Sequence, residues 1–68
     1  MMSNIKRSVT ISGHATSITL EPEFWDTLKE IAAKRDLSIN ALIAEIDQNK
    51  KIDNLSSAIR IYILNSLR

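Results

Sequence analysis

Residues 16–43, TSITLEPEFWDTLKEIAAKRDLSINALI, contain the pattern that decides the fold. A short alternating segment ends at Leu20, and two short segments with apolar stripes follow it directly. Alternation indicates a β-strand, whereas apolar residues three and four apart indicate amphipathic helices. A strand cannot satisfy its own backbone donors and acceptors, so this strand needs a partner. We expect the same strand of a second copy to pair with it and form a two-stranded ribbon.

A second strand signal precedes this stretch. Residues 7–12 alternate, with Arg7, Val9 and Ile11 on one face, and Gly13 punctuates the chain before the strand over about residues 15–20. Two interpretations fit this pattern. The two segments form a hairpin around Gly13, or they form one long strand that kinks at a bulge there.

Three helices are expected, over about residues 22–35, 38–48 and 55–67. Pro22 suits a first helical turn, because it lacks an N–H that would be unpaired there. Ser38 suits the N-cap of the second helix, and either Asn54 or Ser56 caps the third. Apolar residues cover most of the circumference of the third helix, so we expect it to be buried against a partner.

The size of the chain favours a homodimer. A single domain of 68 residues buries a small fraction of its surface, and the chain has no Cys with which to make a disulfide. Association with a second copy is the remaining common way to stabilise it. We expect the dimer core to contain Ile18, Leu20, Phe24, Trp25, Leu28, Leu42, Ile43, Ile46, Ile59, Tyr62 and Ile63.

The composition argues against several classes of protein. No apolar run approaches the ~20 residues that span a bilayer, and no apolar signal core follows the first charged residues, so we expect a cytoplasmic protein. One His, no Cys and no glycine-rich phosphate loop leave little catalytic equipment, so we expect no enzyme, metal site or cofactor. The single His14 is expected to be a turn residue beside Gly13.

The segments Ser17–Leu28 and Leu37–Ile43 resemble the ribbon-helix-helix family, to which the Arc-, Met- and CopG-type repressors belong. With residues 6–14 and 54–58 added, the chain resembles a small bacterial subfamily of uncharacterised ribbon-helix-helix proteins. The resemblance implies a mainly α fold with a short β ribbon. It also implies a homodimer with intermolecular antiparallel strands, extended here by an N-terminal strand and a third C-terminal helix.

The resemblance also implies two kinds of DNA contact. Alternate residues on the outward face of the ribbon touch base edges, and the start of the second helix holds a phosphate through backbone N–H groups. A helix N-terminus concentrates free donors and partial positive charge, which favours an anion there. By position, the base contacts are Ala15, Ser17 and Thr19, and the phosphate contacts are Ser38, Ile39 and Asn40, with Lys6 and Arg7 as further phosphate contacts beside the ribbon.

The outward face departs from the family pattern. Family members commonly carry Arg, Lys, Asn or Gln there, side chains that suit bidentate contacts with guanine and adenine. Here the outward set is short and uncharged, so either the ribbon discriminates weakly between bases or residues 6–12 take part in the contact. A second assignment of the phosphate-binding end, at Ser56-Ser57, also stays open.

The sequence therefore predicts a DNA-binding transcriptional regulator, most simply a repressor that occupies an operator. One alternative is a dimeric protein-interaction module, like an antitoxin or adaptor, that uses the apolar third helix and binds DNA weakly or non-specifically. A further alternative is an architectural protein that binds DNA without regard to sequence.

Overall fold

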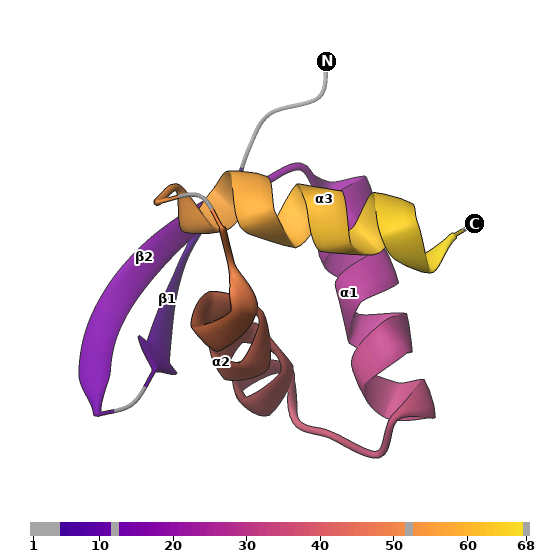
Figure 1. Ribbon diagram of the computed structural model, residues 1–68, viewed down its shortest axis with the longest axis horizontal. Helices are drawn as coiled ribbons and strands as arrows, with labels where there is room; N and C mark the ends of the chain where they lie inside the picture. Colours follow the sequence, from indigo (N-terminus) through magenta and orange to yellow (C-terminus); the bar gives the residue numbers. More distant parts are fainter. Residues whose placement is uncertain (1–4, 12, 52, 68) are drawn as a thin grey trace.

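The computed structural model describes residues 5–11, 13–51 and 53–67 and contains two strands followed by three helices (Figure 1). This order confirms the expected mainly α fold with a short β ribbon. Ser12, the expected end of the first strand, lies outside the described residues. The elements are β1 (Ile5–Ile11), β2 (His14–Leu20), α1 (Pro22–Lys34), α2 (Ile39–Asn49) and α3 (Leu55–Ser66).

The two strands form an antiparallel hairpin within one chain. The register pairs Ile5 with Leu20 and Ile11 with His14. Gly13 has a φ of +81°, which a residue without a Cβ adopts at no steric cost. Of the two interpretations that the alternation left open, the hairpin is the one observed. Within one chain, β2 therefore pairs with β1. We expected it to pair with β2 of a second copy, but β1 supplies a complementary strand.

Side-chain caps and one left-handed residue set the helix ends. Ser38 caps α2 as expected, since its Oγ accepts from the N–H of Ala41 at 3.0 Å. Asn54, and not Ser56, caps α3 by accepting from the N–H of Ser57 at 2.9 Å. Asp36 follows α1 with a φ of 57°, a conformation in which glycine is usual.

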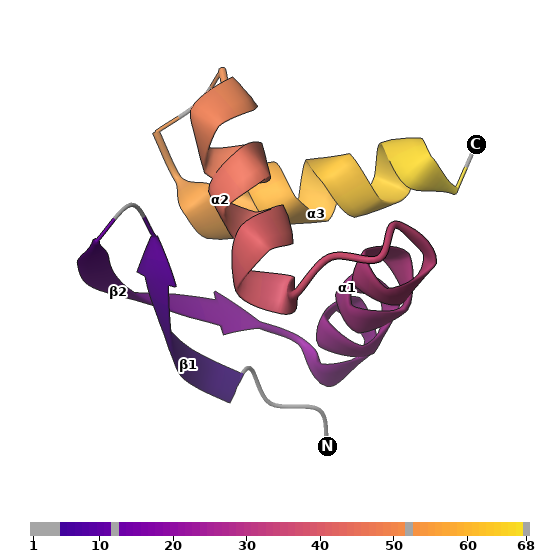
Figure 2. The same ribbon diagram turned by 90° about the horizontal axis from the view of Figure 1, so that it is seen from below.

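The hairpin forms one layer and the helices pack on one of its faces (Figures 1 and 2). α2 packs against β1, whereas α3 packs against β2. α3 also contacts α1 and α2 and runs crosswise over both of them. One face of the hairpin is therefore covered by helices, and the other stays open.

The side chains that we expected in a dimer core form the core of a single chain. Most of them are buried, and Phe24, Trp25 and Tyr62 are half-buried against them. Val9 and Ile11 of β1 complete this core and lie outside the expected set, because their burial depends on the hairpin. One chain thus has more interior than we expected from three short helices. The buried core residues are Val9, Ile11, Ile18, Leu20, Leu28, Ala32, Leu42, Ile43, Ile46, Ala58, Ile59 and Ile63.

α3 keeps an apolar stripe exposed to solvent. The relative exposures of Ile61, Leu64 and Leu67 are 49%, 52% and 70%. One chain covers only the face of α3 that carries Ile59 and Ile63, so burial of the rest of α3 against a partner stays a prediction. Within the described residues, no helix has the length and apolar character needed to cross a membrane.

Candidate nucleic-acid interface

The open face of the hairpin carries six side chains in three cross-strand pairs. The register places Lys6 opposite Thr19, Ser8 opposite Ser17, and Thr10 opposite Ala15. All are exposed except Thr19, which is half-buried. The structure thus brings Lys6 and the three predicted base-contact residues onto one face, and it adds Ser8 and Thr10 from β1. We call this set of six the ribbon face.

The ribbon face is rich in hydroxyl groups, and the first acidic residue of the chain is Glu21, whose carboxylate pairs with Arg60. Residues 1–20 contain Lys6 and Arg7 but no Asp or Glu. A two-stranded antiparallel ribbon is also an element that the major groove of B-DNA admits. Both the shape and the charge of this face are therefore compatible with a polyanion.

Arg7 lies on the other face of the hairpin, toward the helices. Its guanidinium carbon lies 4.3 Å from the centroid of the Trp25 ring, a cation–π distance. Its Nε is buried and has no hydrogen-bond partner among the described residues. Arg7 therefore links β1 to α1, and a phosphate contact by its terminal nitrogens stays a prediction.

At the start of α2, two backbone N–H groups have no hydrogen-bond acceptor within the helix. The Oγ of Ser38 occupies the N–H of Ala41, whereas the first-turn N–H groups of Ile39 and Asn40 lack intrahelical acceptors by the geometry of a helix. Asn40 is exposed and Ile39 is half-buried. α2 packs against β1, and these donors are not part of the ribbon face.

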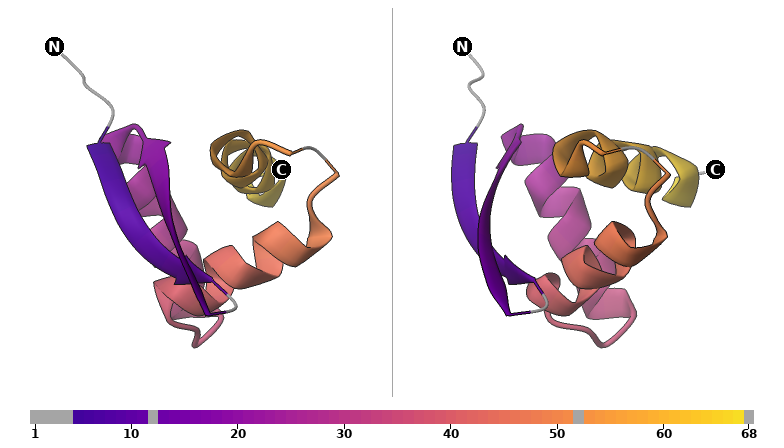
Figure 3. Two further views of the ribbon diagram at one scale, coloured as in Figure 1. Left: turned by 90° about the vertical axis from the view of Figure 1, so that its left-hand side faces the viewer. Right: turned by 60° about the vertical axis from the view of Figure 1, so that its left-hand side comes forward.

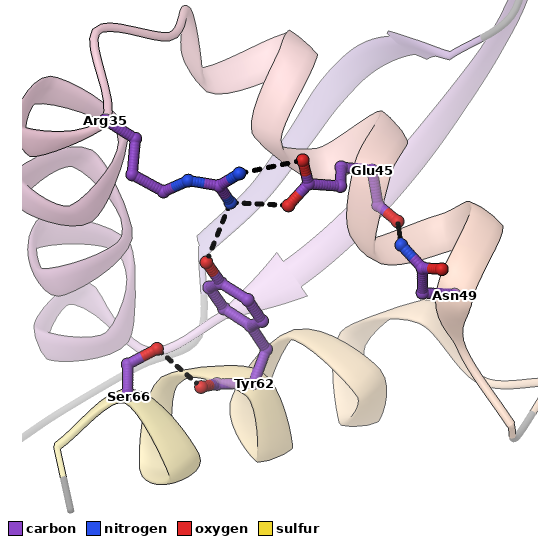
Figure 4. Close-up of polar contacts among 5 residues, drawn as sticks. All are labelled: Arg35, Glu45, Asn49, Tyr62 and Ser66. Carbon is purple, nitrogen blue, oxygen red and sulfur yellow. Dashed lines mark hydrogen bonds and ion pairs between the residues drawn. The ribbon is translucent and has the colours of Figure 1, made fainter.

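A charged cluster that the sequence did not reveal joins the three helices (Figure 4). The guanidinium of Arg35, just after α1, pairs with both carboxylate oxygens of Glu45 on α2, and Nη2 donates to Oε1 at 2.9 Å. Nη1 also donates to the hydroxyl of Tyr62 on α3 at 3.1 Å. The hydrogen bonds from Arg35 lower the pKa of Glu45, and Glu45 in turn raises the pKa of Arg35. Neither residue lies near the other in sequence, so no local pattern signals the pair.

A second polar cluster fixes the edge of β2 to α3. The N–H of Thr19 donates to the Oγ of Ser56 at 3.2 Å, and Nη2 of Arg60 donates to the carbonyl of Thr19 at 3.3 Å. Nε of Arg60 also donates to the carboxylate of Glu21 at 3.0 Å. A backbone hydrogen bond and then this contact lower the pKa of Glu21. Ser56 and Arg60 are four residues apart, the helical spacing that signals a shared face, but the sequence does not reveal which strand that face meets.

Comparison with known proteins gives two matches to this arrangement. A family model described as a ribbon-helix-helix domain matches residues 4–67. The structure of an uncharacterized protein from Bordetella pertussis Tohama I is 33% identical, with a TM-score of 0.80, over 96% of this chain and 56% of that one. No curated protein matches the sequence significantly.

The chain therefore spans little more than half of the Bordetella protein. Ribbon-helix-helix domains in general are DNA-binding transcription regulators and are typically dimeric. The family model covers nearly the whole chain, and the strand and helix order agrees with it. The chain belongs to the ribbon-helix-helix domain family.

Proposed function

We propose that this protein is a DNA-binding transcriptional regulator that represses by occupying an operator, with its ribbon face in the major groove. The observation that carries the proposal is the ribbon face itself. It is an exposed, hydroxyl-rich face of a two-stranded ribbon, in a segment without acidic residues and in a chain of this family. The proposal places the protein in the bacterial cytoplasm, and it involves no cofactor and no catalysis.

The base contacts in this proposal come from short side chains. Ser17 and Thr19 hydrogen-bond base edges, and the methyl groups of Ala15 and Thr19 contact a thymine methyl group. Ser8 and Thr10, which face the same way, extend this surface. Such contacts discriminate less than a bidentate Arg does, so we expect each base position to contribute little to specificity.

The phosphate contacts come from outside this row of hydroxyl groups. Lys6 lies at one end of the ribbon face, where its ammonium group can reach a backbone phosphate. The N–H groups of Ile39 and Asn40, with Ser38 as their cap, hold a second phosphate at the start of α2. Phosphate contacts fix the orientation of the protein on the duplex, whereas base contacts specify the sequence.

The protein acts in this proposal as a homodimer. Two copies related by a two-fold axis would match two half-sites in an operator, which is the usual correspondence between dimer symmetry and palindromic DNA. The exposed stripe of Ile61, Leu64 and Leu67 and the small size of the chain support association.

Titration of the purified protein against duplex DNA at several salt concentrations tests the proposal. Neutralised phosphates release counterions, so the affinity should fall steadily as salt rises. Selection from a random duplex pool should then enrich a palindromic sequence. Affinity that is flat with salt would contradict the phosphate contacts. Salt-dependent binding without enrichment of any sequence would instead indicate an architectural protein that binds DNA without regard to sequence.

One observation favours a second candidate function, a protein-interaction module like an antitoxin or adaptor. The exposed stripe on α3 adjoins a groove in which Ile46, Ala58, Ile61 and Tyr62 lie beside the polar residues Asn49, Lys50, Lys51 and Asn65. Purification from the native cells at low salt separates the two candidates. Nucleic acid that co-purifies favours the regulator, whereas a stoichiometric protein partner favours the interaction module.

A further inference from the structure

The last residue of the ribbon face is held to α3 through its backbone. The N–H of Thr19 donates to the Oγ of Ser56 at 3.2 Å, and its carbonyl accepts from Nη2 of Arg60 at 3.3 Å; both contacts are part-buried. In both views of Figure 3, β2 lies between β1 and α3, so α3 meets the edge of β2 that β1 leaves free. Among the six residues of the ribbon face, Thr19 is the one whose backbone bonds to a helix within the described part of the chain.

Arg60 connects this residue to the start of the next element. Its Nε donates to a carboxylate oxygen of Glu21 at 3.0 Å, while its Nη2 holds the carbonyl of Thr19. Glu21 is the N-cap residue of α1, but its carboxylate makes no capping hydrogen bond there and pairs with Arg60 instead. One guanidinium therefore bridges the end of β2 and the beginning of α1. Because α3 also packs against α1 and α2, this bridge fixes the end of the ribbon relative to the helices.

The placement of the backbone matters more for a short side chain than for a long one. The hydroxyl of Thr19 extends one atom beyond Cβ, so a change of rotamer compensates little for a displaced backbone. A hydrogen bond from a hydroxyl group to an oxygen needs a distance of about 2.5–3.0 Å, and a displacement of about 1 Å is enough to spoil such a contact. A long Arg or Lys side chain would adjust its rotamers instead. The precision of the proposed base contact therefore depends on the backbone of Thr19.

We infer that Arg60 is a positioning residue for base recognition: with Ser56, it holds the backbone of Thr19 so that the side chain meets a base edge. The inference rests on the proposed function, because it names a determinant of specificity for the same ribbon face. Arg60 acts through Thr19 and not on DNA itself, since its Nε and Nη2 are taken by Glu21 and Thr19. The carboxylate of Glu21 also offsets its charge, so Arg60 adds little to the attraction for phosphates.

Arg60→Lys tests this role without a change of charge. A lysine carries one ammonium group on a flexible chain, so it does not reproduce the fixed pair of donors that a guanidinium offers. Arg35→Lys is the matched control, because Arg35 also joins helices, through Glu45 and Tyr62, but its described polar contacts involve no residue of the ribbon. Ser56→Ala removes the other hydrogen bond to the ribbon and is decisive if Arg60→Lys does not fold. Circular dichroism and urea unfolding establish which variants are folded under the binding conditions.

The measured quantity is discrimination at one base pair. Selection from a random duplex pool gives the sequence that the wild type prefers, and loss of discrimination in Thr19→Ala identifies the base pair that Thr19 contacts. The wild type should distinguish that base pair by about fivefold, the low end of the usual cost of one mismatch. Arg60→Lys and Ser56→Ala should lower this ratio to about twofold or less, whereas Arg35→Lys should keep it. Affinity for unrelated duplexes and its salt dependence should stay the same in all variants, since none changes the charge.

Failure of this inference is distinguishable from failure of the proposed function. If the wild type enriches a sequence, the regulator stands, and an unchanged ratio in Arg60→Lys or an equal loss in Arg35→Lys would overturn the inference alone. A uniform loss of affinity for all duplexes in Arg60→Lys would also overturn it, by indicating a direct phosphate contact. So would a Thr19→Ala variant that keeps discrimination at every base pair. A wild type that enriches no sequence would contradict the proposed repressor, and the inference would fail with it.

Discussion

Arg35 and Glu45 join the end of α1 to the middle of α2 through a two-pronged ion pair, with Nη2 and Oε1 2.9 Å apart. The Arg35 guanidinium also reaches the Tyr62 hydroxyl on α3, so one side chain connects all three helices (Figure 4). The fixed, planar geometry of a guanidinium suits such a three-way contact better than a lysine does. The position of α2 beneath the hairpin thus depends in part on a polar contact at the surface.

The ion pair predicts a specific pH dependence of stability. Because Arg35 lowers the pKa of Glu45 in the folded state below its ordinary value, the pair stabilises the fold at any pH above that ordinary value. The contribution is lost as the pH falls through the lowered pKa, since the unfolded chain then binds the proton more tightly. Urea unfolding from neutral to strongly acidic pH should therefore show a shallower acid decline for Glu45→Gln than for the wild type. Tyr62→Phe, which keeps the pair, should keep the wild-type slope; an unchanged slope for Glu45→Gln would contradict the assignment.

The left-handed residue after α1 predicts a stabilising substitution. Asp36 has a φ of 57° and places a negative charge at a helix C-terminus, and both features are unfavourable. Asp36→Gly should raise the free energy of unfolding by about 0.5–1 kcal/mol, because the relief of strain exceeds the added flexibility of the unfolded chain. Lys29→Gly, in the exposed middle of the same helix, should instead lower it by about 1 kcal/mol. Chemical denaturation measures both, and changes of the same sign would show that the conformation of Asp36 carries no strain.

The contact between β2 and α3 predicts unequal effects for two adjacent serines. Ser56→Ala removes the acceptor for the N–H of Thr19, a part-buried hydrogen bond, and should lower the free energy of unfolding by about 1 kcal/mol. The Oγ of Ser57 makes no hydrogen bond among the described residues, so Ser57→Ala should change stability by less than about 0.5 kcal/mol. Hydrogen exchange at the Thr19 amide should also accelerate only in Ser56→Ala. If the Thr19 amide is as protected from exchange in Ser56→Ala as in the wild type, the hydrogen bond from Thr19 to Ser56 does not protect it.

The start of α2 predicts a variant in which stability and DNA binding respond differently. Asn40→Asp adds a negative charge where we propose a phosphate, so it should weaken binding to all duplexes several-fold. The same charge is favourable at a helix N-terminus and should raise stability by about 0.3–1 kcal/mol. Gln48→Glu adds equal charge near the other end of α2 and should leave the affinity close to that of the wild type. Equal weakening by both variants would indicate a general charge effect and no local phosphate site.

The sequence predicted local structure well and the partners of each element less well. Ser38, Pro22 and the alternation before Leu20 act within a few residues, so they identify strands, helices and one cap without tertiary information. The partner of β2 depends on whether the chain reverses at Gly13, and alternation does not encode that choice.

Long-range polar contacts are the other part that local patterns miss. The charge of Arg7 suggests a phosphate contact, and only tertiary packing reveals its position over Trp25. The contacts of Arg35 and Arg60 span 10 to 41 residues, so they depend on how the helices pack and not on the spacing within any one element.

Chemical-shift mapping of the labelled protein with duplex DNA tests most directly whether the ribbon face meets DNA. We predict that amide signals of Lys6, Ser8, Ser17 and Thr19 shift together with those of Ile39 and Asn40, while the exposed stripe of α3 at Ile61 and Leu64 stays unchanged. Shifts confined to α3, or none under low-salt conditions, would contradict the ribbon-face assignment.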